Sequence, residues 1–84
     1  MEIRFSEHAL RRAKERGIDI ELVKSAIRDP VDVVDVKFGR KASYKQFDGY
    51  YLVVILEEQK DEIVVVTVLK VDKVRLRRYG FNRI

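Results

Sequence analysis

The chain has 84 residues, which suffices for one small domain and is too short for two. With 46% hydrophobic and 38% charged residues, it has the composition of a soluble globular protein. It contains no Cys and a single His, His8, so disulfides and thiolate zinc sites are excluded and a metal site is not expected. We therefore predict one domain over residues 1–84 that uses no metal and no other cofactor.

The apolar segments are short. The longest runs, Tyr50–Leu56 and Ile63–Leu69, have seven residues each, whereas a membrane helix needs about 20. The N-terminal residues also lack the apolar stretch of a signal peptide. These features predict a cytoplasmic protein with no membrane contact.

Two helices are predicted in the first third of the chain. The first, Glu7–Arg16, follows Ser6 as its N-cap and ends before Gly17. The second, Ile20–Arg28, follows Asp19 as its N-cap and ends at Asp29-Pro30, because a residue before proline avoids helical backbone angles. The very short connection between them predicts a helical hairpin.

Strand-type patterns follow the helices. Asp48-Gly49 is a strong signal for a two-residue hairpin loop, which pairs Phe47 with Tyr50 and requires positive φ at Gly49. The polar stretch Glu57–Glu62 is predicted to turn the chain again. The predicted strands are Val31–Phe38, Ala42–Phe47, Tyr50–Leu56 and Ile63–Val71, with Glu2–Phe5 as a candidate fifth. The expected fold is α+β, with the two-helix hairpin packed on a four-stranded or five-stranded antiparallel sheet.

Two of these strands, Tyr50–Leu56 and Ile63–Leu69, are apolar at nearly every position instead of alternating. A strand with this pattern is normally covered on both faces, and two short helices can cover only one. Either the C-terminal extension, residues 72–84, covers the other face and leaves a monomer, or a second copy or a protein partner does. The five cations of the extension favour the second alternative.

The charge is unevenly distributed. Residues 1–72 contain 13 Lys and Arg against 14 Asp and Glu, so the net charge of +4 arises from five cations in residues 73–84. Cations interleaved with aromatic rings suit a nucleic acid, because the cations meet phosphates and the rings stack on bases. The alternatives are a solvated segment or one that binds an acidic partner. The candidate nucleic-acid-binding residues are Lys45, Arg75, Arg77, Arg78, Tyr79 and Arg83.

One stripe of the first helix carries His8, Arg12 and Arg16, which lie four residues apart and so share a side. A histidine can move a proton at a 2′-hydroxyl or leaving oxygen, and arginines neutralise the charge that grows on the phosphate. Thr67 is the only hydroxyl inside an apolar strand. The plain alternatives are a solvated surface histidine and a threonine with a purely structural role.

The run Phe5-Ser6-Glu7-His8-Ala9, continued by Arg12 and by Arg16-Gly17-Ile18, resembles the opening of the domain of unknown function 4258 family. Val66-Thr67-Val68 resembles the closing element of that family. The family is similar in architecture to RelE/ParE-type toxins, which implies a RelE-like fold and metal-free endoribonuclease chemistry. By this resemblance His8, Arg12 and Arg16 are the leading catalytic candidates, followed by Lys45 and Thr67.

The resemblance predicts a toxin-type protein that binds RNA, cleaves it without a metal and pairs with a protein antitoxin. Two other functions remain open. One is a nucleic-acid-binding module without catalysis, and the other is a protein-interaction domain, which includes a homodimer.

Overall fold

Both predicted helices are present, and each begins directly after its predicted N-cap residue. The computed structural model describes residues 2–82, with α1 at Glu7–Glu15 and α2 at Ile20–Arg28. The Ser6 hydroxyl accepts a hydrogen bond from the Ala9 amide at 3.0 Å, and the Asp19 carboxylate accepts one from the Glu21 amide at 2.8 Å. These bonds satisfy amides that have no partner within the helix.

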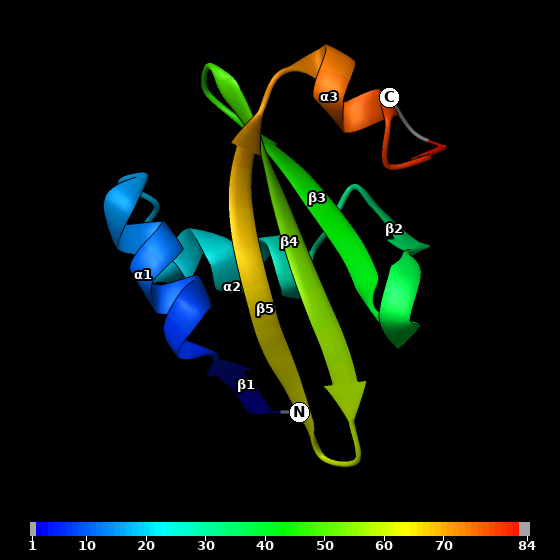
Figure 1. Ribbon diagram of the computed structural model, residues 1–84. Coiled ribbons are helices and arrows are strands. Elements are labelled where there is room, and N and C mark those ends of the chain that lie inside the picture. The colour runs from blue at the N-terminus through cyan, green and yellow to red at the C-terminus, as the bar shows by residue number, and fades with distance from the viewer. Residues whose placement is uncertain (1, 83–84) are drawn as a thin grey trace.

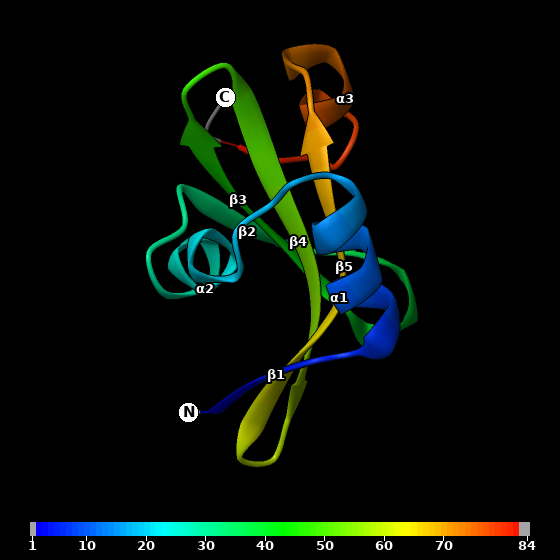
Figure 2. The same cartoon turned by 90° about the vertical axis from the view of Figure 1, so that its left-hand side faces the viewer.

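The two helices do not pack along each other as a hairpin. α1 packs mainly on β5 (Glu62–Val71), whereas α2 packs on β3 (Lys41–Phe47) and β4 (Tyr50–Gln59). Figure 2 shows them at separate places on one side of the sheet. The expected hairpin is thus replaced by two helices that are each held by the sheet.

The sheet has five strands in the order β1-β5-β4-β3-β2, where β1 is Glu2–Phe5 and β2 is Asp32–Asp35 (Figure 1). The predicted fifth strand is present, but the sheet is mixed and not antiparallel, because β1 pairs with β5 in parallel. Hairpin turns set the direction of β4 and β5, and no such turn joins β1 to its neighbour. The Ser6 amide donates to the Val65 carbonyl at 3.0 Å, so the chain leaves β1 for α1 directly beside β5.

The hairpin at Asp48-Gly49 is confirmed. Phe47 pairs with Tyr50, and Gly49 has a φ of 81°. The next turn is tighter than predicted, because β4 continues to Gln59 and β5 begins at Glu62.

The segment after β2 differs from the prediction. Strand structure ends at Asp35, and a short 3-10 turn spans Lys37–Gly39. Within it Phe38 has a φ of 65°, a left-handed conformation that favours glycine or asparagine. The pattern of Val31–Phe38 predicted strand structure up to Phe38, whereas the strand ends at Asp35 and the turn begins before Phe38.

One side of the sheet, called the helix face below, packs against α1 and α2. Ala9, Ala13 and Val23 from the helices are buried there against Leu52, Val54 and Val65 from the strands. The residues of this core are Ala9, Ala13, Ile18, Val23, Ala26, Leu52, Val54, Leu56, Val65 and Val68.

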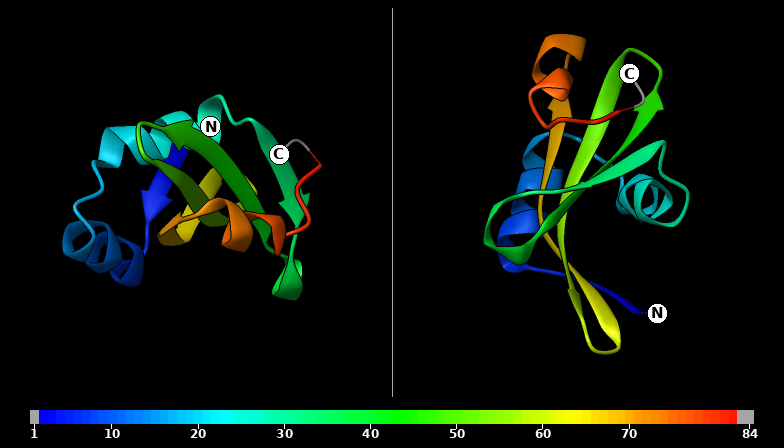
Figure 3. Two further views of the ribbon diagram at one scale, coloured as in Figure 1. Left: turned by 90° about the horizontal axis from the view of Figure 1, so that it is seen from above. Right: turned by 90° about the vertical axis from the view of Figure 1, so that its right-hand side faces the viewer.

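The opposite side, called the tail face, is covered by the C-terminal extension. A helix that the sequence did not predict, α3 (Lys73–Arg77), buries Leu76, and Phe81 packs on Tyr44 with ring centroids 4.5 Å apart. The Asn82 amide also donates to the Asp32 carboxylate at 2.7 Å. Viewed from above in Figure 3, the sheet separates α3 from α2. Of the two alternatives for this face, covering by the chain's own extension is the one observed.

Candidate nucleic-acid interface

The stripe on α1 begins with His8 on the first turn of the helix. Its side chain is exposed, and it makes no hydrogen bond or ion pair with the described residues. Beside it, the Ser6 hydroxyl that caps the helix donates to the Val66 carbonyl at 3.1 Å. The start of α1 is therefore anchored to the sheet, and His8 projects from a fixed position.

The two arginines of the stripe have partners. Arg12 forms an ion pair of 3.0 Å with Glu15, and both side chains are largely exposed. Arg16 donates from Nη1 to the Val68 carbonyl at 2.7 Å. This carbonyl belongs to the part of β5 that extends past β1, so Arg16 supplies a donor that a neighbouring strand would otherwise provide.

Thr67 lies away from this stripe. It pairs across the sheet with Ile55, a residue of the tail face, while its neighbour Val68 points into the helix-face core. A register shift at Ile55/Leu56 gives β5 one extra residue, Val66, between the paired Val65 and Thr67. The structure consequently does not bring Thr67 and His8 together on one face.

Lys45 holds two elements together. Its ammonium group donates to the Ser25 hydroxyl at 3.0 Å and lies 3.1 Å from the Asp29 carboxylate. These contacts tie β3 to the C-terminal end of α2. Lys45 is therefore engaged on the helix face, apart from the cations of the extension.

The remaining predicted residues gather around α3. Asp72 caps this helix by accepting from the Arg75 amide at 2.8 Å. Leu76 points inward, and four cations point to solvent: Lys73, Arg75, Arg77 and Arg78. No ion pair between described residues involves any of the four. We call these four residues the α3 patch.

Two aromatic residues, Tyr79 and Phe81, follow the α3 patch in the chain. Tyr79 is partly buried, with its ring 5.9 Å from that of Phe81, so one part of the phenol ring remains accessible. Arg83, the last predicted binding residue, lies outside the described residues.

An exposed aromatic residue escaped the sequence analysis. Phe38 is 84% exposed on the turn between β2 and β3, and the Arg40 guanidinium lies 5.9 Å from the centre of its ring. The only sequence signal was the Gly39 that follows it, since a Phe-Gly pair can occupy a tight turn. A ring held outward in a strained conformation is a second accessible surface for contacts.

Within residues 2–82, no three His, Asp or Glu side chains are grouped as metal ligands would be. None of the helices in this range is long and apolar enough to cross a membrane.

The geometry describes a small α+β domain with two helices on one face of a mixed sheet and a basic extension on the other. A family model, Domain of unknown function (DUF4258), matches residues 5–70. The match covers well over half of the chain, and the protein belongs to this family. No curated protein and no solved structure matches the chain. The α3 patch lies beyond the matched residues.

Proposed function

We propose that the protein binds single-stranded RNA through the α3 patch. The observation that carries this proposal is that four cations on one short helix are exposed and have no acidic partner among the described residues, although the helix itself is anchored by a buried Leu76. Unpaired cations held in a fixed arrangement gain most from phosphate contacts, because binding releases counterions from the nucleic acid.

The surroundings of the α3 patch suit a single strand. The partly exposed ring of Tyr79 can stack on a base, and such stacking tolerates any sequence. The C-terminal end of α1 points toward the same end of the molecule as α3 (Figure 2). A single-stranded RNA that runs along this end of the molecule would contact the α3 patch first and the α1 stripe next.

A charge-neutralising variant tests RNA binding without disturbing the fold. Deleting the extension would also remove Leu76 and Phe81 from the tail face, so its effect on binding could not be separated from unfolding. We expect Arg75→Gln, Arg77→Gln and Arg78→Gln together to weaken binding to a fluorescent oligonucleotide. The slope of log K against log salt should fall by about 0.7 for each phosphate that the variant no longer neutralises.

The matched control is Lys60→Gln, which removes an exposed cation from the β4–β5 turn. It should leave both affinity and salt slope unchanged. If the triple variant keeps the affinity and slope of the wild type while remaining folded, the α3 patch does not bind RNA. The function as a protein-interaction domain would then be favoured.

The second candidate function is metal-independent RNA cleavage in a RelE-like, toxin-type protein paired with an antitoxin. The favouring observation is that His8 is exposed and unbonded on a helix anchored to the sheet. In this proposal His8 transfers the proton, and Arg12 neutralises charge on the phosphate after leaving Glu15. Leaving is inexpensive, because an exposed ion pair contributes only about 0–1 kcal/mol. Arg16 holds the stripe against β5.

Cleavage is tested by incubating RNA with the protein in EDTA. Replacing His8 with Ala should reduce the rate by about 10²- to 10⁴-fold, the usual contribution of general acid–base catalysis. Lys14→Ala, an exposed change on the same helix, is the control and should retain activity. Full activity in His8→Ala, or loss of wild-type activity through EDTA alone, would exclude this mechanism. If the wild-type protein binds RNA but does not cleave it, the remaining function is a nucleic-acid-binding module without catalysis.

A further inference from the structure

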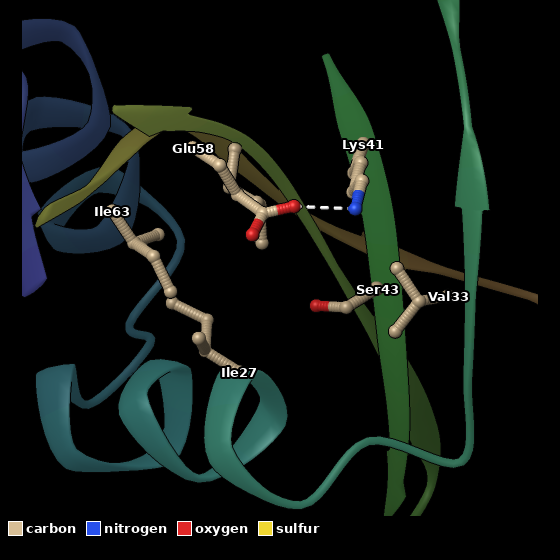
Figure 4. Close-up of a pocket in the computed structure, with 7 residues that line it drawn as sticks. Ile27, Val33, Lys41, Ser43, Glu58 and Ile63 are labelled. Carbon is tan, nitrogen blue, oxygen red and sulfur yellow. Dashed lines mark ion pairs between the residues drawn. The ribbon is translucent and has the colours of Figure 1, made fainter. Parts of the chain in front are cut away.

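A pocket of about 300 Å³ opens on the helix face of the sheet, toward the turn between β4 and β5 (Figure 4). It lies beside the C-terminal half of α2, from which Ile27 points into it. Its lining comes from α2 and four strands: Ile27, Val33, Lys41, Ser43, Leu56, Glu58 and Ile63. The volume is at the lower end of the range of about 300–1,000 Å³ that is usual for small-molecule sites.

The floor of the pocket carries an unusual polar group. Ser43 is 1% exposed, and its hydroxyl has no hydrogen-bond partner in the described structure. Figure 4 shows this oxygen directed into the pocket, between Glu58 and Ile27. A buried hydroxyl without a partner is unfavourable by about 1–3 kcal/mol. Nothing in the packing of β3 requires a hydroxyl here, since its cross-strand partners are Val33 and Val54.

The walls of the pocket are apolar, and the two charged residues at its mouth have opposite charges. Ile27, Leu56 and Ile63 present hydrocarbon to the interior, whereas Lys41 and Glu58 form an ion pair at the opening. The Glu58 carboxylate raises the pKa of Lys41 above its usual value, so this lysine stays charged and paired at neutral pH. An anionic ligand would have to displace Glu58 from Lys41 and would then lie beside that carboxylate, so the mouth favours an uncharged ligand.

We propose that this pocket binds a small, uncharged and mainly apolar molecule with one hydrogen-bonding group that pairs with the Ser43 hydroxyl. An apolar cavity of about 150 Å³ accommodates benzene in another protein, so this pocket has room for about two fused rings. Such a ligand would cover apolar surface of Ile27 and Ile63 and satisfy the only unpartnered buried side-chain oxygen among the described residues. The site lies on the opposite face of the sheet from the α3 patch and does not depend on RNA binding.

Two probes of nearly equal shape test the proposal. Indole carries an N–H donor, whereas benzofuran has the same two-ring outline and no donor. Each is titrated into the ¹⁵N-labelled full chain, and amide shifts are followed by NMR. We expect saturable shifts at Ser43 and at its partners Val33 and Val54, with tighter binding of indole than of benzofuran. Benzoate, an anion, should produce no saturable shift.

Variants test whether the preference for indole over benzofuran depends on the Ser43 hydroxyl. Ser43→Ala should weaken indole binding by about 3- to 10-fold, the value of one hydrogen bond, and should leave benzofuran binding unchanged. Ser25→Ala is the matched control, because it removes a serine hydroxyl on the same face that already has a partner in Lys45. Ile27→Phe narrows the pocket and should weaken both probes, with the amide spectrum confirming that the fold is kept.

Three results would overturn the proposal. The first is the lack of any saturable shift in the wild type up to the solubility of indole. The second is an unchanged preference for indole in Ser43→Ala. The third is a set of shifts that maps to α3 instead of the pocket. None of these bears on the α3 patch, whose test measures RNA affinity.

Discussion

Both faces of the sheet carry a buried core, but the two cores are covered by very different means. On the helix face, two capped helices of nine residues each cover Leu52, which is fully buried. On the tail face, a helix of only five residues and the segment after it cover Val53, which is also fully buried, and Leu76 of the helix is buried against the strands. A sheet face can thus be covered by a few separate anchors as well as by a continuous apolar stripe, provided that the anchors are held in place.

The tail face also shows how one segment can be both basic and part of the core. Leu76 and Phe81 point toward the strands, and the cations between and before them point to solvent. The sequence prediction treated five cations as an obstacle to covering the sheet. The four that the structure describes are no obstacle, because the turns of α3 and the chain after it direct charged and apolar side chains to opposite sides.

The largest expected effect tests whether the two faces contribute equally to stability. Leu52→Ala and Leu76→Ala should each lower the free energy of unfolding by about 2–5 kcal/mol, because each leaves a cavity in a packed core. Val74, on the same helix as Leu76 but 61% exposed, provides the control. Urea denaturation should show a change below about 0.5 kcal/mol for Val74→Ala. A Leu76→Ala variant as stable as Val74→Ala would mean that the extension does not cover the tail face.

The covered tail face also predicts the oligomeric state. With Leu76 and Phe81 packed on this face, its apolar strand residues are already buried or partly buried within one chain, and a second copy is not needed to cover them. Light scattering should therefore give the mass of a monomer at high protein concentration. A stable dimer at micromolar concentration would show that association, and not the extension alone, protects the sheet.

A gain in stability is expected on the helix face. Ser43→Ala removes the unpartnered hydroxyl and should raise the free energy of unfolding by about 1 kcal/mol. Ser25→Ala should lower it by a similar amount, because the Lys45 ammonium loses an acceptor. The two alanine variants are compared by thermal or urea unfolding. A loss of stability in both would indicate that the Ser43 hydroxyl has a structural partner after all.

A smaller gain is expected at the turn between β2 and β3. Asparagine tolerates a left-handed conformation better than phenylalanine does. Phe38→Asn should therefore stabilise the protein by about 0.5 kcal/mol, a net value that includes removal of the ring from beside Arg40. Phe38→Ala keeps the strain and should bring no gain. Equal unfolding midpoints for the alanine and asparagine variants would exclude strain at this residue.

The smallest effect concerns the α3 patch. Neutralising Arg75, Arg77 and Arg78 should change the free energy of unfolding by less than about 0.5 kcal/mol, since none has a partner among the described residues. The same chemical denaturation experiment applies. A large loss would assign these arginines to the packing of the tail face and weaken the case that they serve RNA.

Much of the fold follows from short-range signals in the sequence. Ser6 and Asp19 mark the starts of α1 and α2, and Asp48-Gly49 fixes the loop and register of β3 and β4. These features were predictable because each depends on hydrogen bonds or backbone angles within a few residues. The apolar character of β4 and β5 also indicated correctly that both of their faces are covered.

The candidate site was only partly predictable. Helical spacing correctly places His8 and Arg12 on one helix, but it carries no information about the carbonyl that Arg16 meets on β5. The face on which Thr67 lies depends on the extra residue in β5, and the partners of Lys45 come from α2 and the residue that follows it. Such contacts join residues far apart in the chain, so local patterns cannot reveal them.

By itself, the sequence determined α1, α2, the central hairpin and the concentration of positive charge after residue 72, because caps, turn residues and composition act locally. Only the tertiary structure decided the parallel direction of β1, the covering of the tail face and the pocket at Ser43. In each case the outcome depends on which distant surfaces are buried together. Burial is a property of the packed chain, and the same serine or leucine would have a different role beside other neighbours.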